Sequence, residues 1–219
     1  MDHDAGPSQR DNPCQFSPEV LDVLEPLILP AEFIHDPFAG HGTRLAALCD
    51  RLGAHFSGTD IEVWRGHDPR VGVADARDPS SYPSVSFTVI TSPVYLNKRC
   101  ADYPNGPTPT TKIRGRRDYG IALGRALHSD NFARFTGRPR RASDYWQGHG
   151  EAVKHWGDRA IVNVDLPISD GWRRLLVDHG YRIEQVIPAY TRRYGGLDNS
   201  NLRAEHEVVI VATGSACVW

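Results

Sequence analysis

The sequence predicts an α/β protein with an open, doubly wound, Rossmann-like sheet of seven strands that is mostly parallel and ends in an antiparallel hairpin. Short runs rich in Val, Ile, Phe and Thr alternate with helical runs along the chain, and this alternation is typical of parallel sheets. The last two apolar runs have no helical run between them, which is typical of a hairpin. Gly, Asp and Pro follow several strand-like runs directly, at the strand ends where such sheets bind their ligands.

The first half of the domain is expected to begin with a helix after a polar tail of residues 1–13. Ser17-Pro18-Glu19 favours a helix start, because Ser caps a helix, Pro suits its first position and Glu faces the positive end of its dipole. The helix ends by Pro30. The elements expected next are a strand at Phe33–Asp36, a helix at Arg44–Leu52, and strands at His55–Asp60, Val71–Ala74 and Val85–Thr91.

The second half is expected to resume after a long segment at about 96–150. A helix at Glu151–Gly157, a strand at Ala160–Asp165 and a helix at Trp172–His179 come first, and Gly180 closes the second helix. Tyr181–Ala189 and Glu207–Thr213 are expected to be the last two strands. Residues 14–219 would then form one domain with an insertion at about 96–150.

The charge of the chain is unevenly distributed. Residues 96–150 hold eleven Lys and Arg against four Asp, a net charge of +7, while the remaining residues carry −9. A basic block within an acidic chain indicates either a surface that meets an anion such as nucleic acid or a solvated Arg-rich loop.

Several classes of protein are disfavoured. The sequence has no stretch of 18 apolar residues, so no transmembrane helix is expected, and its polar start does not resemble a signal peptide. The four cysteines form no CxxC pair, and the ten histidines show no HxH or HExxH spacing. We therefore expect a cytoplasmic protein with no membrane partner, no disulfide framework and no metal site.

The most informative segment is Asp36-Pro-Phe-Ala-Gly40-His-Gly42-Thr43, between an expected strand and an expected helix. Glycines at these positions permit positive φ and close approach of a ligand, and the helix start presents unpaired N–H groups. The segment is not GxGxxG and lacks the lysine of a P-loop, which disfavours a nucleoside triphosphate. Taken alone, it is equally consistent with a plain strand-to-helix turn.

The wider pattern resembles the amino-methyltransferases that act on DNA, which are class I S-adenosylmethionine (SAM) enzymes modifying exocyclic amines of cytosine or adenine. Their motifs are DPFxGxGT and (S/D/N)PPY. This sequence has DPFAGHGT, then Asp60 after a strand, then Thr91-Ser-Pro-Val-Tyr95 after a later strand. The glycine motif comes first, as in one subgroup that also carries an N-terminal helix contacting SAM. The resemblance spans Phe16 to Thr213.

The resemblance implies SAM as the cofactor and assigns its contacts residue by residue. Asp36 would accept from the methionine ammonium, Asp60 from the ribose hydroxyls and Asp75 from the adenine amine. Glu62 is an alternative ribose ligand, and Asp75 could instead cap a helix. The full set implied to contact SAM is Phe16, Ser17, Asp36, Phe38, Gly40, Gly42, Thr43, Asp60 and Asp75.

The same resemblance implies a catalytic role for Ser92, Pro93 and Tyr95. The Ser92 hydroxyl and the Pro93 carbonyl would accept hydrogen bonds from the target amine and orient its lone pair, while Tyr95 would stack on the base. Val94 replaces the family's second proline, which puts rigidity and rate in doubt. A serine in the first position favours N4 of cytosine over N6 of adenine.

The expected partner is DNA with its target base flipped out of the duplex. Basic residues beyond the catalytic motif would contact phosphates. The aromatic residues interleaved with them could stack on bases or pack the insertion onto the domain, and packing is expected for most of them; they are Tyr103, Tyr119, Phe132, Phe135, Tyr145 and Trp146. The alternatives are an RNA methyltransferase and a catalytically weak nucleic-acid-binding homologue. A bacterial or phage restriction-modification setting would suit such an enzyme, whereas its oligomeric state stays open. The residues expected to contact nucleic acid are Lys98, Arg99, Lys112, Arg114, Arg116, Arg117, Arg140, Arg141, Arg192 and Arg193.

Overall fold

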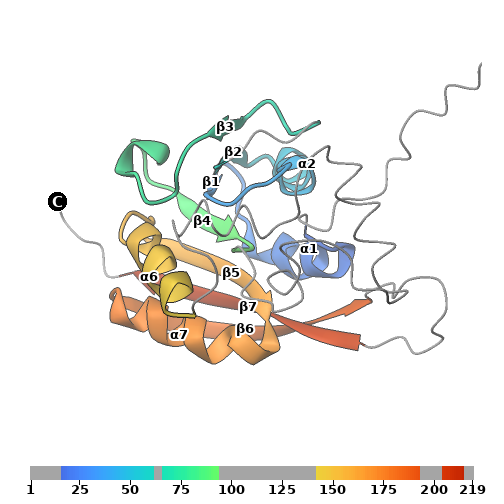
Figure 1. Ribbon diagram of the computed structural model, residues 1–219. Helices are drawn as coiled ribbons and strands as arrows, with labels where there is room; N and C mark the ends of the chain where they lie inside the picture. The colour runs from blue at the N-terminus through green and yellow to red at the C-terminus, as the bar shows by residue number, and fades with distance from the viewer. Residues whose placement is uncertain (1–15, 62–65, 94–141, 193–203, 215–219) are drawn as a thin grey trace, which may run out of the picture.

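The computed structural model describes residues 16–61, 66–93, 142–192 and 204–214. They form a seven-stranded sheet in the order β3-β2-β1-β4-β5-β7-β6 (Figure 1). The strands are β1 (Phe33–Asp36), β2 (His55–Asp60), β3 (Val71–Val73), β4 (Thr88–Thr91), β5 (Arg159–Asp165), β6 (Tyr181–Arg192) and β7 (Ala204–Gly214). The predicted α/β fold class is confirmed, because five strands pair in parallel and only the pairings made by β7 are antiparallel.

The strand order reverses next to β1. The chain runs outward from β1 to β2 and β3 on one side, then returns to place β4 and β5 on the other side. In the register, β1 residue Asp36 pairs with Gly58 of β2, and His35 pairs with Val89 of β4. Ligands of open α/β sheets bind at such a reversal, beyond the carboxyl ends of the strands. The segments that follow β1 and β4 therefore start at the favoured binding edge.

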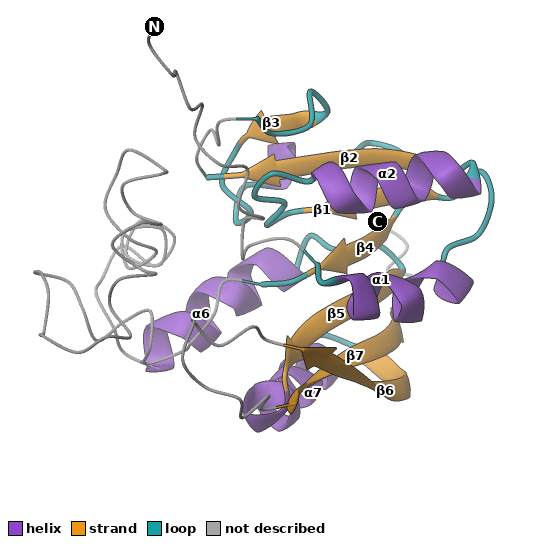
Figure 2. Ribbon diagram, turned by 90° about the vertical axis from the view of Figure 1, so that its right-hand side faces the viewer, coloured by secondary structure: helices purple, strands orange, loops and turns teal. Residues whose placement is uncertain are grey.

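Helices cover both faces of the sheet. The longer helices are α1 (Pro18–Leu24), α2 (Thr43–Leu52), α6 (Ala142–Val153) and α7 (Ser169–Asp178), and short 3₁₀ turns lie at Glu25–Leu27, Pro79–Ser81 and Leu166–Ile168. Figures 1 and 2 show α1 and α2 on one face and α6 and α7 on the other. Each face has its own buried apolar cluster, one around Leu24, Ile34 and Ile90 and the other around Tyr145, Val162 and Trp172.

Polar and glycine residues lie at the helix ends, among them the predicted Ser17 and Gly180. The Ser17 hydroxyl accepts a hydrogen bond from the Val20 N–H at 3.2 Å and caps α1. Glycines at positive φ bound α2, with Gly42 at 64° before it and Gly53 at 70° after it. Gly180, at φ 85°, follows the end of α7.

Several predicted boundaries differ from the structure, among them the start of α7, which lies at Ser169 and not at Trp172. The strand before Ser92 begins at Thr88 and not at Val85, whose side chain is 53% exposed. The helix predicted to begin at Glu151 begins at Ala142, and its glycines at 148 and 150 lower helix propensity enough to hide it in the sequence. The final strands are longer than predicted, because the pairing of β6 and β7 extends to Arg192 and Ala204.

The described residues contain neither a membrane span nor a cluster of metal ligands. No helix among them is long and apolar enough to cross a membrane. Within the same ranges, no three His, Cys, Asp or Glu side chains are grouped so that they could hold a metal ion.

Candidate functional site

A hydrogen bond joins the two sequence motifs at the carboxyl edge of the sheet. Asp36 ends β1 and is buried, and its Oδ1 accepts from the Thr91 hydroxyl at 2.6 Å. The same oxygen accepts from the backbone N–H of Phe38 at 3.0 Å. Thr91 ends β4 directly before Ser92 and Pro93. One carboxyl group therefore holds both the start of the glycine turn and the residue before the expected catalytic segment.

The environment of Asp36 favours a cation. Burial raises its pKa to about 7, and the nearby charge of Asp60 adds to the rise. The hydrogen bonds from Thr91 and Phe38 lower the pKa and offset only part of this effect. A positive group placed beside Asp36 would stabilise its charged form.

The glycine turn folds back onto the end of β2. The Gly40 N–H donates to Asp60 Oδ2 at 3.0 Å, and the Ala39 N–H donates to the Thr59 carbonyl at 2.9 Å. Gly40 and Gly42 both have positive φ, at 55° and 64°. A Cβ on Gly42 would lie 2.6 Å from Val71 Cγ2. Conformation and space both require glycine at position 42.

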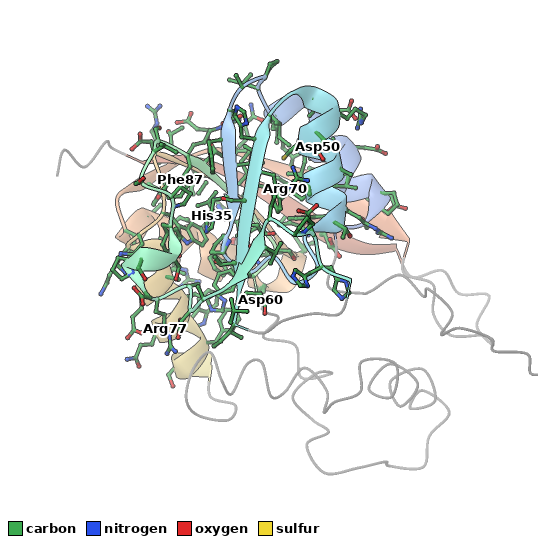
Figure 3. The ribbon with its side chains drawn as sticks, turned by 90° about the horizontal axis from the view of Figure 1, so that it is seen from above. His35, Asp50, Asp60, Arg70, Arg77 and Phe87 are labelled. Atoms are coloured by element: carbon green, nitrogen blue, oxygen red, sulfur yellow. The ribbon has the colours of Figure 1, made fainter. Side chains whose placement is uncertain are left out.

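The carboxylate of Asp60 lies at the carboxyl end of β2, as predicted. Figure 3 shows Asp60 and Arg77 toward one end of the sheet and Asp50 and Phe87 toward the other. A carboxylate has lone pairs for several donors, so the bond from Gly40 is compatible with a second donor. Glu62, the alternative ribose ligand, lies outside the described residues.

Phe38 links the glycine turn to α6. Its ring lies 5.2 Å from the ring of His149, measured between centroids. Burial lowers the pKa of His149 to about 3, against the raising effect of its bond to the Tyr145 carbonyl, so the imidazole is neutral. Because a carbonyl only accepts, the Nδ1 atom of His149 donates to it, at 2.8 Å. Tyr145 itself is fully buried and its hydroxyl accepts from Trp172 Nε1, which agrees with the predicted packing role.

Asp75 follows β3 and is paired with Arg77. Its Oδ1 accepts from the Arg77 backbone N–H and from Nε, both at 2.9 Å, and its Oδ2 accepts from Nη2. Burial raises the pKa of Asp75, but the hydrogen bonds from Arg77 outweigh this and bring it below its ordinary value. The residue does not cap a helix, because Asp78 takes that position before the turn at Pro79–Ser81. An adenine amine at Asp75 would have to share the carboxylate with Arg77.

The remaining predicted residues are only partly described. Ser92 is half-buried and Pro93 is buried, directly after β4. Phe16 is buried, and its carbonyl accepts from Arg44 Nη1 at 2.9 Å, which ties the start of α1 to α2, the helix that begins at Thr43. The backbone of Arg192 ends β6. Tyr95 and Val94 lie outside the described residues, as do Lys98, Arg99, Lys112, Arg114, Arg116, Arg117, Arg140, Arg141 and Arg193.

Sequence reasoning missed four residues at this edge. Thr91 precedes Ser92 in the chain, and Arg77 is two residues after Asp75. This closeness to predicted site residues could have indicated both of them. Asn163 and Glu207 form a buried hydrogen-bonded pair across β5 and β7. Asn163 stands inside an apolar run, and a polar residue within such a run is the signal that could have found it, whereas Glu207 follows the polar residues Glu205 and His206 and gives no such signal.

Comparisons with known proteins support the fold. No protein-family model matches the chain, and no curated protein matches it. Among solved structures, a TehB-like SAM-dependent methyltransferase from Corynebacterium glutamicum aligns with a TM-score of 0.50 at 13% identity, over 90% of this chain and 88% of that one. A protein from Thermoplasma acidophilum aligns with a TM-score of 0.50 at 14% identity, over 90% and 86% of the two chains. At this level of identity the likeness shows a shared fold.

Proposed function

We propose that the chain is a SAM-dependent DNA amino-methyltransferase that methylates N4 of cytosine. The observation that carries this proposal is the 2.6 Å hydrogen bond from Thr91 to Asp36. It brings the glycine motif and the Ser92-Pro93 segment together at the point where the strand order reverses, where a ligand would be expected. The shared fold with a SAM-dependent methyltransferase supports the same reading.

The residues at this edge fit SAM. Its ammonium is a cation, and the buried, raised-pKa carboxyl of Asp36 gains from one. Gly42 lets the turn pack closely against Val71 and Phe56 at positive φ, and this fixes the backbone that would face the ligand. Asp60 would accept from the ribose hydroxyls, and charge assistance strengthens such bonds. Phe16, Ser17, Phe38, Gly40 and Thr43 would complete the surroundings of the methionine, and Asp75 those of the adenine.

SAM, when bound, supplies a methyl group on a sulfonium. The chain's own task is to prepare the amine, which is a poor nucleophile because its lone pair is delocalised into the base ring. The Ser92 hydroxyl oxygen and the Pro93 carbonyl would accept from its two N–H bonds and hold the lone pair in line. This is catalysis by orientation, and Tyr95 would hold the ring by stacking. The amine nitrogen then carries one proton too many, and this proton passes to water.

The substrate in this proposal is duplex DNA with one base flipped out. Flipping costs a few kcal/mol, which stacking and hydrogen bonds in the pocket offset. The basic segment from Lys98 to Arg141, together with Arg192 and Arg193, would hold the phosphates. Cytosine is preferred to adenine because a neutral serine stands where the adenine enzymes more often carry Asp.

The experiment is methyl transfer from labelled SAM to DNA, RNA and protein, followed by nucleoside analysis. We expect N4-methylcytosine in DNA. Ser92→Ala should lose most of the turnover and keep SAM binding. Ser80→Ala is the matched control, because Ser80 is exposed on the turn after β3 and its interaction with the Asp78 carboxylate is local to that turn.

Each other outcome of that experiment changes the proposal in a defined way. N6-methyladenine would correct the base, and label found only in RNA would correct the nucleic acid. Label in protein alone contradicts the proposal. Salt-dependent DNA binding without any methyl transfer would favour the catalytically weak homologue. The observation that favours this alternative is Val94, which stands in place of the second proline of the catalytic motif.

A further inference from the structure

A buried polar pair lies within the apolar strands beside the proposed catalytic segment. Asn163 on β5 is 3% exposed and Glu207 on β7 is 7% exposed. Asn163 Nδ2 donates to Glu207 Oε2 at 3.0 Å. Val162 and Val164 flank Asn163 on β5, and Val208 and Val209 follow Glu207 on β7; all four are buried.

Stability does not account for this pair. Removing an amide and a carboxylate from water costs free energy, and hydrogen bonds made in the interior return only part of it. Replacing a buried ionic or polar pair by apolar side chains of similar volume is often neutral or stabilising. The pair therefore points to a function other than holding the sheet together.

The strand register places Asn163 next to Ser92. In the parallel ladder, Thr91 of β4 pairs with Val162 of β5, so Ser92 and Asn163 are the next residues on the two strands. Ile90 and Ile161, two residues earlier, belong to the same buried cluster beneath α1 and α2. Side chains alternate along a strand, so Asn163 continues the face of Ile161, and Ser92 stands at the matching position beyond Ile90.

Glu207 determines which way the Asn163 amide faces. A carboxylate oxygen only accepts, so the NH₂ of Asn163 faces Glu207 and the carbonyl oxygen faces away. Within the described residues, this buried Oδ1 atom has no hydrogen-bond partner. A buried acceptor without a donor is costly, and the structure therefore leaves one strong acceptor beside Ser92.

We propose that Asn163, oriented by Glu207, is a positioning residue that accepts the hydrogen of the Ser92 hydroxyl during the reaction. The inference rests on the proposed function. A serine hydroxyl has one hydrogen and two lone pairs. If the hydrogen is held by Asn163, a lone pair of Ser92 Oγ is directed at the target amine. The Glu207 carboxylate polarises the amide and strengthens the chain of hydrogen bonds, which makes a neutral serine a better acceptor.

The test is a double-mutant cycle between Ser92 and the pair. Asn163→Leu together with Glu207→Leu removes both members of the pair and puts apolar side chains in their place. In the background that retains Ser92, this change should lower kcat by about tenfold or more, as misplacement of a reacting group does, with SAM binding unchanged. In the Ser92→Ala background, the same change should have no further effect on kcat. Thr213→Val, which removes an exposed hydroxyl bond to Glu184 on β6, is the control for a change in β7.

Glu207→Gln provides an independent variant that keeps the size of the side chain. Its amide can also donate, so Asn163 loses its fixed orientation and kcat should again fall only when Ser92 is present. Equal loss of kcat with and without the Ser92→Ala substitution overturns the positioning role while leaving the proposed function intact. Absence of methyl transfer by the wild-type chain to any nucleic acid overturns both.

Discussion

Replacing Asp36 by Asn is expected to stabilise the chain, by an amount that grows with pH. The asparagine has the same shape, and its Oδ1 can still accept from Thr91 and from the Phe38 N–H, at the positions 2.6 and 3.0 Å away in the native protein. The variant removes the charge and exchanges Oδ2 for an NH₂ group. The measured quantity is the difference in free energy of unfolding between variant and wild type.

The size of the effect follows from the pKa of Asp36, which burial raises from an ordinary 3.8 to about 7. Between these values the folded carboxyl keeps a proton that the unfolded chain has lost, so wild-type stability falls as pH rises through this window. Each unit of pKa shift corresponds to about 1.4 kcal/mol, so the variant should gain about 4 kcal/mol above pH 7 and almost nothing near pH 4.

The assay is urea unfolding of both proteins from pH 4.5 to 8.5. The buried His35 and His149, whose pKa values are lowered by burial, titrate in both proteins and cancel in the difference. Asp22→Asn, at an exposed position on α1, is the control for loss of a surface charge. A difference that stays constant across this range, or one that falls with rising pH, would refute the reasoning. At pH 8 the Asp36 variant should also bind SAM more weakly, since the ammonium would lose its proposed partner.

The remaining predictions concern the same edge of the sheet. Thr91→Val removes the hydroxyl that donates to Asp36 and should cost about 1–3 kcal/mol of stability in urea unfolding. Thr91→Ser should restore most of the loss, and a valine variant as stable as wild type would contradict the role of this bond. Gly42→Ala should lower stability by about 1–3 kcal/mol and weaken SAM binding in calorimetry, because its Cβ would lie 2.6 Å from Val71 at φ +64°. Gly72→Ala, on β3 with open space around its Cβ, is the control, and equal effects of the two variants would exclude the steric explanation.

The regular elements could be predicted because their signals are local. β1 and β2 begin and end where the apolar pattern placed them, at Phe33–Asp36 and His55–Asp60. The start of α6 was missed because two glycines weaken its helical signal, while its buried face is recognisable only once Tyr145 and His149 have neighbours. Burial of a helix face is a tertiary property, and it overrides intrinsic propensity.

In the candidate site, too, some features could be predicted from local sequence and others depend on tertiary contacts. The glycine turn and the Ser92-Pro93 segment were identifiable from residue type and spacing alone. The hydrogen bond from Thr91 to Asp36 spans 55 positions, and the pair Asn163 and Glu207 spans 44. Such contacts depend on which strands become neighbours in the sheet. The strand order cannot be predicted from the hydrophobic pattern of a short stretch of sequence.

By itself, the sequence determined the fold class, the order of the motifs and the residue types available for chemistry, because backbone preference and hydrophobic period act over a few residues. Only the tertiary structure decided which carboxyl group is buried with a raised pKa, which one is paired with an arginine, and which amide oxygen is buried without a hydrogen-bond donor. Burial and pairing depend on groups that are distant in the chain and meet only when the sheet is assembled.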